Sequence, residues 1–386
     1  MERVMLCAPD WVQGTDTTSA LIGGGSWDAT QNAAKVATDD VNDQAISTDC
    51  TLASTQMYFD FQVPRDARAA IITDHNIDNF GLVRWRGSNT NAWAGATVTM
   101  VWSGGTAGQE WGGYGYIQGG ILTGAAISIF EGQLIKFSGH DTIYKVLFND
   151  TELDPVDFPY FTQYIEPALT HDVAIGETIT TICGDFSEEE AVYNSGWFDG
   201  VPMTYDYGDV FYGHPSYYSL KPTAEDRALY TIPAVKTFNP VLAQYWHLEI
   251  DNTANPAGVI RIARVVIARG NQPTINLAPG ATSIGWLSNT KVSVTNSGRR
   301  LYRKKRAQRN VPCLIKDLPR QEAFATFFDL QGTLDLNKQF YFIFDPSDTS
   351  LMHRRSFLAT FEALNPIQFP YAFGGNDVPL NILEVI

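Results

Sequence analysis

Short runs of strand-forming residues, each ended by proline, glycine or polar turn residues, are the feature that most limits the fold of this chain. They lie at 57–63, 67–74, 80–88, 96–104, 142–150 and 339–348. β-Branched and aromatic residues favour strands, and Pro64 and the polar segment 75–79 are expected to end the first two. The chain also contains 32 Gly, 19 Pro and 12% aromatic residues, which favours many short strands over a helical bundle.

The length of the chain bounds its domain organisation. At 386 residues it exceeds one ordinary core, so two or more domains are expected. We predict a mainly β protein whose N-terminal domain, 1–270, is a jelly-roll-like β-sandwich with a loop-rich insertion at about 104–240. A C-terminal β-barrel-like domain, 271–386, carries one helix over 318–332, where apolar residues recur at helical spacing and Gly332 suits a C-cap.

Residues 245–270 read as a strand, a turn and a second strand. The turn at 251–258 is rich in Asn, Pro and Gly, and residues 259–268 are largely apolar. A hairpin with its apolar side inward would place Arg261 and Arg264 at a rim or an interface.

Charge is strongly segregated along the chain. Residues 1–260 contain 11 Lys and Arg against 33 Asp and Glu, whereas residues 261–320 contain 13 against one. The overall charge of −15 argues against general nucleic-acid binding. A basic block between acidic blocks instead predicts docking on copies of the same chain or on another acidic partner.

The most basic segment is SGRRLYRKKRAQRN, at 297–310. Runs of this kind also occur in nuclear-localisation and RNA-binding arms. Because strand patterns precede and follow it, we interpret it as part of a folded domain and as an electrostatic docking face for a neighbouring subunit. The residues predicted to form this face are Arg299, Arg300, Arg303, Lys304, Lys305, Arg306 and Arg309.

The sequence lacks the patterns typical of catalytic and metal sites. The sequence contains no HExxH, no GxSxG elbow and no Walker or Rossmann glycine pattern. Its four cysteines are far apart and form no CxxC. We therefore expect no catalytic residues, no metal, no cofactor and no enzymatic activity. No apolar run is long enough to span a bilayer, and the first residues do not read as a signal peptide.

Aromatic residues crowd the region between 103 and 219. Flat rings beside Asp and Asn side chains suit a sugar, and the candidate glycan contacts are Trp111, Trp197, Tyr205 and Tyr207. A simpler interpretation is that these rings supply rigid contact area within long loops. Carboxylates at 154 and 157, 188–190, and 199, 206 and 209 leave open a polysaccharide-degrading enzyme that uses a carboxylate pair.

Two stretches carry a family resemblance. ARAAIITDHNIDNFGLVRWRGS (67–88) and YWHLEIDNTANPAGVIRIARVVIARG (245–270) resemble the first and closing strands of the galactose-binding-like jelly roll in virion proteins of tailed bacteriophages. Residues 291–348 hold a basic strand, a Phe-rich helix and an aromatic strand ending in Asp-Pro. This order is similar to the barrel of phage distal-tail and minor tail-tip proteins.

The resemblance implies a structural virion protein of the tail tip or baseplate, made in the host bacterial cytoplasm. It would assemble as a ring, a trimer or hexamer, and dock to the hub and tail tube without binding nucleic acid or spanning a membrane. A carbohydrate- or receptor-binding module directed at a host surface glycan is the first alternative. A polysaccharide-degrading enzyme is the second.

Overall fold

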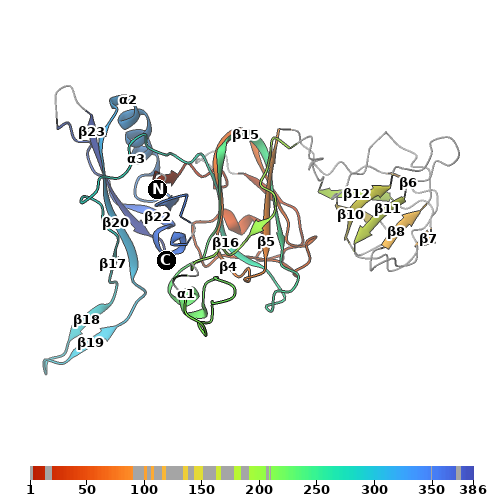
Figure 1. Ribbon diagram of the computed structural model, residues 1–386, viewed down its shortest axis with the longest axis horizontal. Helices are drawn as coiled ribbons and strands as arrows, with labels where there is room; N and C mark the ends of the chain where they lie inside the picture. The colour runs from red at the N-terminus through yellow and green to blue at the C-terminus, as the bar shows by residue number, and fades with distance from the viewer. Residues whose placement is uncertain are drawn as a thin grey trace.

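The computed structural model describes residues 3–13, 20–89, 191–205, 208, 210–348, 350–370 and 375–386, together with seven strands between 100 and 183. The prediction of a mainly β fold is confirmed, because 42% of the chain lies in strands and 11% in helices. The strands form antiparallel, sandwich-like sheets (Figure 1). Within the described residues, no strands close into a barrel.

An eight-stranded sheet occupies the middle of the molecule. Its strand order is β13-β5-β15-β4-β16-β3, with β14 paired to β5 and β2 paired to β4. The strands are β2 (Leu21–Gly23), β3 (Ala45–Ile46), β4 (Met57–His75), β5 (Leu82–Ser88), β13 (Tyr193–Asn194), β14 (Phe198–Asp199), β15 (Ala234–Asp251) and β16 (Arg261–Ala268).

Pro64 does not end a strand, contrary to the sequence prediction. β4 runs through it for 19 residues, and its pairing with β15 shifts register twice in this region. Gln62 has a left-handed backbone, with φ 63°. An irregular stretch of this kind tolerates proline because the ladder hydrogen bonds are already interrupted there.

The predicted hairpin at 245–270 is also wrong. Both strands exist, but β4 lies between them and pairs with β15 on one side and β16 on the other. β16 is therefore an interior strand with both faces covered, which explains its apolar sequence. Arg261 is exposed, whereas Arg264 is buried and does not lie at a rim.

A six-stranded sheet forms the C-terminal part, in the order β1-β21-β22-β23-β20-β17. Its strands are β1 (Met5–Cys7), β17 (Gly285–Leu287), β20 (Gln308–Leu318), β21 (Phe340–Ile343), β22 (Phe357–Ala363) and β23 (Asn376–Glu384). The predicted helix is present as α2 (Arg320–Glu322), η2 (Ala323–Phe328) and α3 (Asp329–Leu334). It ends after Leu334, where Asp335 has φ 48°, and not at Gly332.

The two sheets pack on each other through a shared apolar layer. Ala69 and Ile71 of β4 and Val266 of β16 meet Tyr341 and Leu358 of the six-stranded sheet. β1 pairs with β21, so the first strand of the chain belongs to the C-terminal sheet although the prediction assigned 1–270 to one N-terminal domain. Burial at this junction joins the two parts into one packed body.

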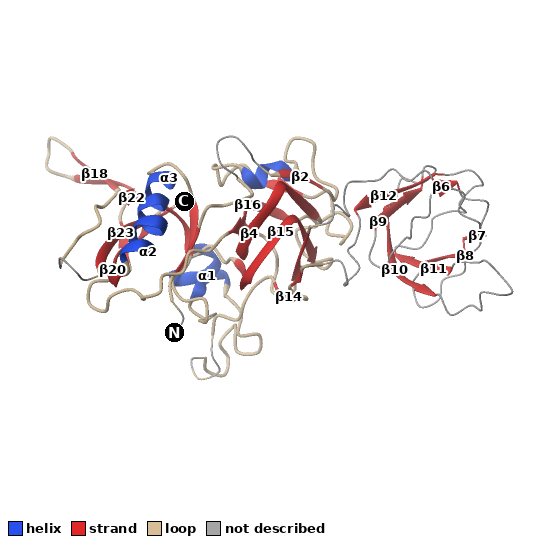
Figure 2. Cartoon of the chain, turned by 90° about the horizontal axis from the view of Figure 1, so that it is seen from above, coloured by secondary structure: helices blue, strands red, loops and turns tan. Residues whose placement is uncertain are grey.

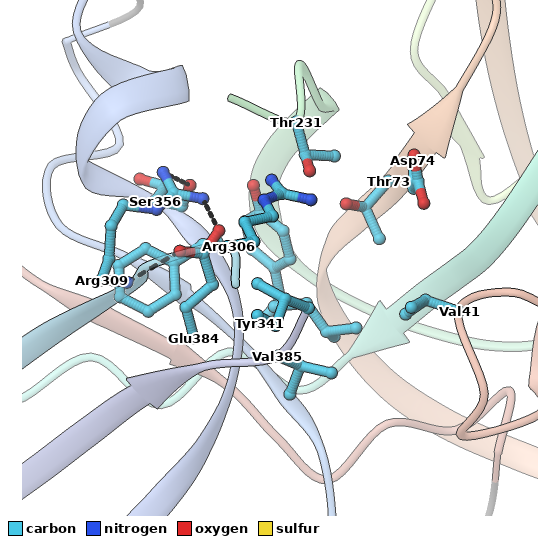
Figure 3. Close-up of a pocket in the computed structure, with 13 residues that line it drawn as sticks. Val41, Thr73, Asp74, Thr231, Arg306, Arg309, Tyr341, Ser356, Glu384 and Val385 are labelled. Atoms are coloured by element: carbon cyan, nitrogen blue, oxygen red, sulfur yellow. Dashed lines mark hydrogen bonds and ion pairs between the residues drawn. The ribbon is translucent and has the colours of Figure 1, made fainter. Parts of the chain in front are cut away.

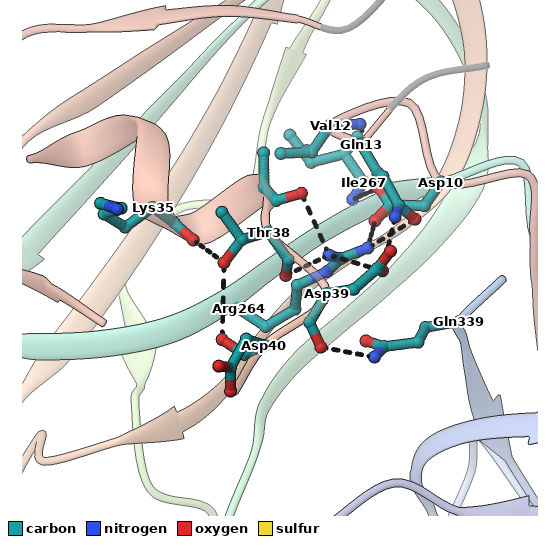
Figure 4. Close-up of polar contacts among 11 residues, drawn as sticks. Asp10, Val12, Gln13, Lys35, Thr38, Asp39, Asp40, Arg264, Ile267 and Gln339 are labelled. Atoms are coloured by element: carbon teal, nitrogen blue, oxygen red, sulfur yellow. Dashed lines mark hydrogen bonds and ion pairs between the residues drawn. The ribbon is translucent and has the colours of Figure 1, made fainter. Parts of the chain in front are cut away.

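A buried arginine also ties the N-terminal segment to this junction (Figure 4). Arg264 Nη2 lies 2.8 Å from Asp10 Oδ2, and its Nη1 donates to the Thr38 carbonyl at 2.7 Å. Beside it, Gln339 of the C-terminal part donates to the Asp39 carbonyl at 2.7 Å. Residues more than 250 positions apart thus satisfy one another's polar groups.

A third sheet lies on the far side of the eight-stranded sheet (Figures 1 and 2). It contains seven strands in the order β6-β12-β9-β10-β11-β8-β7. They are β6 (Met100–Val101), β7 (Thr106–Ala107), β8 (Gly115–Gln118), β9 (Leu134–Phe137), β10 (Ile143–Asp150), β11 (Thr162–Glu166) and β12 (Thr178–Cys183). These strands occur in the sequence between β5 and β13, which are paired, so the sheet is an insertion into the middle one.

Candidate functional site

The basic run folds into a projecting hairpin. β18 (Lys291–Val294) and β19 (Arg300–Arg303) form a two-stranded sheet of their own. We call residues 291–303 the arm. It extends away from the six-stranded sheet, beyond β17 and β20 (Figure 1). Every residue of both arm strands is exposed.

The sequence at the tip explains why the arm forms. Gly298 takes the left-handed backbone that the turn needs, with φ 80°. Its amide donates to the Thr295 carbonyl at 2.9 Å, and the Arg299 amide donates to Thr295 Oγ1 at 3.1 Å. At the base, Asn289 Nδ2 donates to the Arg306 carbonyl at 3.1 Å and to Gln308 Oε1 at 2.8 Å. Both ends of the hairpin are therefore fixed locally.

The two faces of the arm differ in chemistry. Val292 pairs with Tyr302 and Val294 with Arg300, so these four side chains share one face. Val292, Val294 and Tyr302 are 53%, 64% and 64% exposed. The opposite face carries Ser293 across from Leu301 and Lys291 directly across from Arg303. Like charges placed directly opposite destabilise a hairpin, so folding alone does not account for this face.

Six of the seven predicted docking residues are exposed. Arg299, Arg300 and Arg303 lie on the arm, and Lys304, Lys305 and Arg306 follow it in the irregular segment that leads to β20. Within the described part of the chain, their side chains make no hydrogen bond or ion pair. The sequence predicted that this run lies within a compact folded domain. The structure shows instead that it forms an element that projects from the six-stranded sheet.

Arg309 does not belong to this face. It is 2% exposed, and its Nη2 lies 2.5 Å from Glu384 Oε1. Its Nη1 donates to the His353 carbonyl at 2.7 Å, and its guanidinium lies 4.5 Å from the centre of the Phe357 ring. Arg309 lies on β20, six residues beyond the arm, where its side chain points into the junction of the two main sheets.

Arg306 faces back toward the body of the protein (Figure 3). With Asp74, Arg309, Tyr341 and Glu384 it lines a cavity of about 30 Å³. Burial raises the pKa of Asp74 more than the charge of Arg306 lowers it. A cavity of this size holds about one water and has no room for a substrate.

Of the four predicted glycan contacts, the structure describes Trp197 and Tyr205. Trp197 is partly exposed and lies with its ring centre 4.6 Å from the Arg84 guanidinium. The Tyr205 hydroxyl donates to Asp226 Oδ2 at 2.6 Å, so it is engaged within the fold. Burial, followed by that hydrogen bond, raises the pKa of Tyr205. Trp111 and Tyr207 lie outside the described residues.

The aromatic region noted in the sequence contains a second exposed surface, outside the four candidate glycan contacts. Phe211, Tyr212 and Tyr218 are 72%, 78% and 82% exposed and lie between β14 and α1 (Ala224–Leu229). We call residues 210–220 the aromatic loop. The density of Tyr with Gly and Pro between 203 and 219 was its only sequence signal, because no periodicity distinguishes exposed rings from buried ones.

The described residues show neither a metal cluster nor a membrane-spanning helix. They contain no group of three or more His, Cys, Asp or Glu placed to hold a metal ion. No helix among them has the length and apolar character needed to cross a bilayer. Asp199, from one of the predicted carboxylate groups, lies 2.9 Å from Lys221 Nζ. Comparison of the chain with protein-family models, curated proteins and solved structures finds no match.

Proposed function

We propose that this protein is a structural component of a tailed-phage tail tip, and that the arm docks it onto neighbouring subunits. The observation that carries the proposal is the arm, a projecting hairpin whose cations and apolar face have no partner among the described residues. The phage assignment itself rests on the sequence resemblance described above. On that assignment, the protein would form a ring in contact with the hub and tail tube and would have no catalytic role.

The pairing of the buried arginines supports an external partner for the arm. Arg86 Nη2 lies 2.7 Å from Glu249, and Arg264 and Arg309 have carboxylates at 2.8 and 2.5 Å. The fold thus neutralises these guanidinium groups with its own carboxylates. The exposed cations of the arm have no such partner within the described residues, so an acidic surface on another subunit can bind them.

The apolar face of the arm supports the same proposal. A lone two-stranded hairpin is at best marginally stable, and the water-exposed area of its apolar side chains adds no burial to that stability. Contact with a partner would bury Val292, Val294 and Tyr302 and would stabilise the arm as it binds. Arg300 lies on the same face, so a partner that covers it would meet an apolar surface with a charged edge.

Charge neutralisation tests the proposal. In one variant, called the arm variant, the last residue of the arm, Arg303, and the three cations that follow it, Lys304, Lys305 and Arg306, are all changed to Gln. The control carries the same change at four cations away from the arm, Arg261, Arg269, Lys316 and Arg320. We expect the arm variant to fold normally by circular dichroism and to sediment as a monomer, while the control assembles like the wild type. Normal assembly of a folded arm variant would defeat the proposal.

Glycan binding is the second candidate, because Trp197 and the aromatic loop expose rings to solvent. A glycan array followed by calorimetric titration would test it. If Trp197 contributes a stacking platform, Trp197→Ala should weaken binding at least tenfold. Unchanged affinity would exclude Trp197 from the site.

A further inference from the structure

A polar cleft of about 550 Å³ lies where the first strand of the chain meets the eight-stranded sheet. One wall comes from the residues around β1 and after β16, and the other comes from β4 and β15. Sites for small ligands often lie between two packed units and span about 300–1,000 Å³. The polar residues that line this cleft are Arg3, Arg68, Thr237, Asn239 and Gln272.

The wall beside β1 is held by hydrogen bonds of the fold. Leu6 and Asn271 exchange backbone hydrogen bonds at 2.9 and 2.7 Å. Gln272 Nε2 donates to the Arg3 carbonyl at 3.0 Å, and Arg3 Nη1 donates to the Pro273 carbonyl at 3.3 Å. This wall is therefore formed before any ligand arrives, which lowers the entropic cost of binding.

A bulge forms the opposite wall. The pairing of β4 with β15 is interrupted beside the cleft, where residues 238–240 lie opposite Arg68 alone. Bulges open a sheet locally and redirect side chains, and they are frequent next to functional sites. Here the bulge brings Asn239 and Arg68 to the same cleft.

Gly270 allows the two walls to approach each other. It has φ 67°, and a Cβ at this position would lie 3.0 Å from Met5 Sδ and 3.1 Å from Arg68 Cβ. Glycine accepts this backbone conformation and adds no side chain to the narrow space. The chain can therefore pass between β1 and Arg68 and set the width of the cleft.

Arg68 lacks a counter-charge. It is half-buried, and within the described part of the chain its guanidinium makes no hydrogen bond or ion pair. The residues that line the cleft include no Asp or Glu, and the nearby carboxylate of Asp66 lies 3.8 Å from Arg269. By contrast, the buried guanidinium groups of Arg86 and Arg264 each meet a carboxylate. An anion that enters the cleft would supply the missing charge.

We propose that this cleft binds an anionic sugar, a hydroxylated ring that carries a carboxylate or a phosphate. The planar fork of a guanidinium pairs with either group through two parallel hydrogen bonds. The Thr237 hydroxyl and the side-chain amides of Asn239 and Gln272 can both donate to and accept from the ring hydroxyls.

The size and lining of the cleft favour a sugar over other anions. Inorganic phosphate would leave most of the 550 Å³ to water and would not use the amides. An acidic protein segment would need pockets for aromatic or aliphatic anchors, whereas most of this lining is polar. The cleft shares no residue with the arm or with Trp197, so the inference does not depend on the proposed function.

Calorimetric titration of the full chain with defined probes tests the inference. The probes are glucuronate, glucose-6-phosphate, neutral glucose, inorganic phosphate and a hexaglutamate peptide, all at equal ionic strength. The site variant changes Arg3 and Arg68 to Gln, and a matched control changes two exposed arginines elsewhere, Arg261 and Arg320, to Gln. Circular dichroism checks the folding of each variant. Because Arg3 is exposed, Arg3→Gln alone serves if the double change unfolds the protein.

We expect at least one of the two anionic sugars to bind the wild type and the control equally well, and neutral glucose not to bind. The tighter of the two identifies the anionic group. The site variant should lose about tenfold or more in affinity, and Arg3→Gln should lose part of this. Asn239→Ala should weaken binding of the sugar and leave binding of inorganic phosphate unchanged. Raising the salt concentration from 0.05 to 0.5 M should weaken binding of the sugar.

Several results would overturn the inference. Neither anionic sugar binding to the wild type would do so, as would unchanged affinity in a folded site variant or in Arg3→Gln. Equal binding of neutral glucose would show that charge plays no part. Inorganic phosphate that binds as tightly as the sugars would leave only a general anion site. Hexaglutamate that binds more tightly than both sugars would assign the cleft to a protein partner.

Discussion

Glu249 is the buried carboxylate whose loss should have the clearest effect on stability. It lies on β15 and is 1% exposed. Its two oxygens accept from Arg84 Nε at 2.5 Å and Arg84 Nη2 at 2.9 Å, and Arg86 Nη2 donates to it at 2.7 Å. Glu249→Gln keeps the size of the side chain but leaves two guanidinium groups without their counter-charge.

The pKa of Glu249 sets the size of the expected loss in unfolding free energy. Burial alone would raise this pKa, but His247, Arg86 and Arg84 together lower it from 4.5 to about 2. At about 1.4 kcal/mol per pKa unit, the ionised form contributes about 3 kcal/mol to the free energy of unfolding. Breaking a buried ion pair by removing one partner costs about 3–5 kcal/mol. We expect Glu249→Gln to lose about this amount at pH 7.

The pH dependence gives the second part of the test. Because the folded pKa is depressed, the contribution is fully present above pH 4.5 and is lost as the pH falls toward 2. The difference in unfolding free energy between the wild type and Glu249→Gln should therefore shrink over this window. This difference can be measured by urea unfolding with tryptophan fluorescence as the signal, since Trp85 and Trp246 are buried in the same sheet.

The control is Glu362→Gln, which changes an exposed carboxylate on β22. We expect it to alter the unfolding free energy by less than about 0.5 kcal/mol. A loss below about 1 kcal/mol for Glu249→Gln at pH 7 would refute the reasoning. So would a difference from the wild type that stays constant between pH 6 and pH 2.

Three further predictions concern other buried groups. Burial, together with the neighbouring Arg354, lowers the pKa of His353 to about 4; the unfolded chain therefore takes up a proton below pH 6.5 that the folded protein does not, and stability falls toward pH 4. His353→Gln should reduce that fall in urea titrations at pH 7 and 4.5, and an identical fall would contradict it. Thr223→Ala removes the capping box and should cost about 1 kcal/mol in thermal unfolding, whereas Thr223→Ser should cost less; equal losses would count against the cap. Burial raises the pKa of the thiols of Cys7, Cys50 and Cys313, so in the native protein they should resist a thiol reagent that labels them after unfolding. Rapid labelling of these three in the native state would show that they are accessible.

Some elements were predictable because they depend on neighbouring residues alone. The strand at 80–88 is β5, the strand at 142–150 is β10, and the helix at 318–332 is found at 320–334. Alternation, strand propensity and helical spacing act within a few residues, and they are readable in any single sequence. The exposure of the arm cations was predictable for the same reason, since a dense run of like charges cannot be buried together.

Other features depended on residues far away in the chain. The strands at 245–251 and 261–268 look like a hairpin, yet β4 lies between them because pairing is chosen by the whole sheet. Pro64 lies inside a strand because the ladder around it is already irregular. Nothing local to the aromatic loop indicates which of its rings face solvent.

Arg264 and Arg309, which the sequence analysis placed at an exposed face, show most clearly what sequence alone cannot predict. Sequence alone determined that 261–320 is basic and that its densest part lies outside any apolar core. It did not determine that Arg264 would meet Asp10, 254 positions away, or that Arg309 would meet Glu384, 75 positions away. A guanidinium can be buried only where a carboxylate is brought to it, and only the tertiary structure decides where that happens.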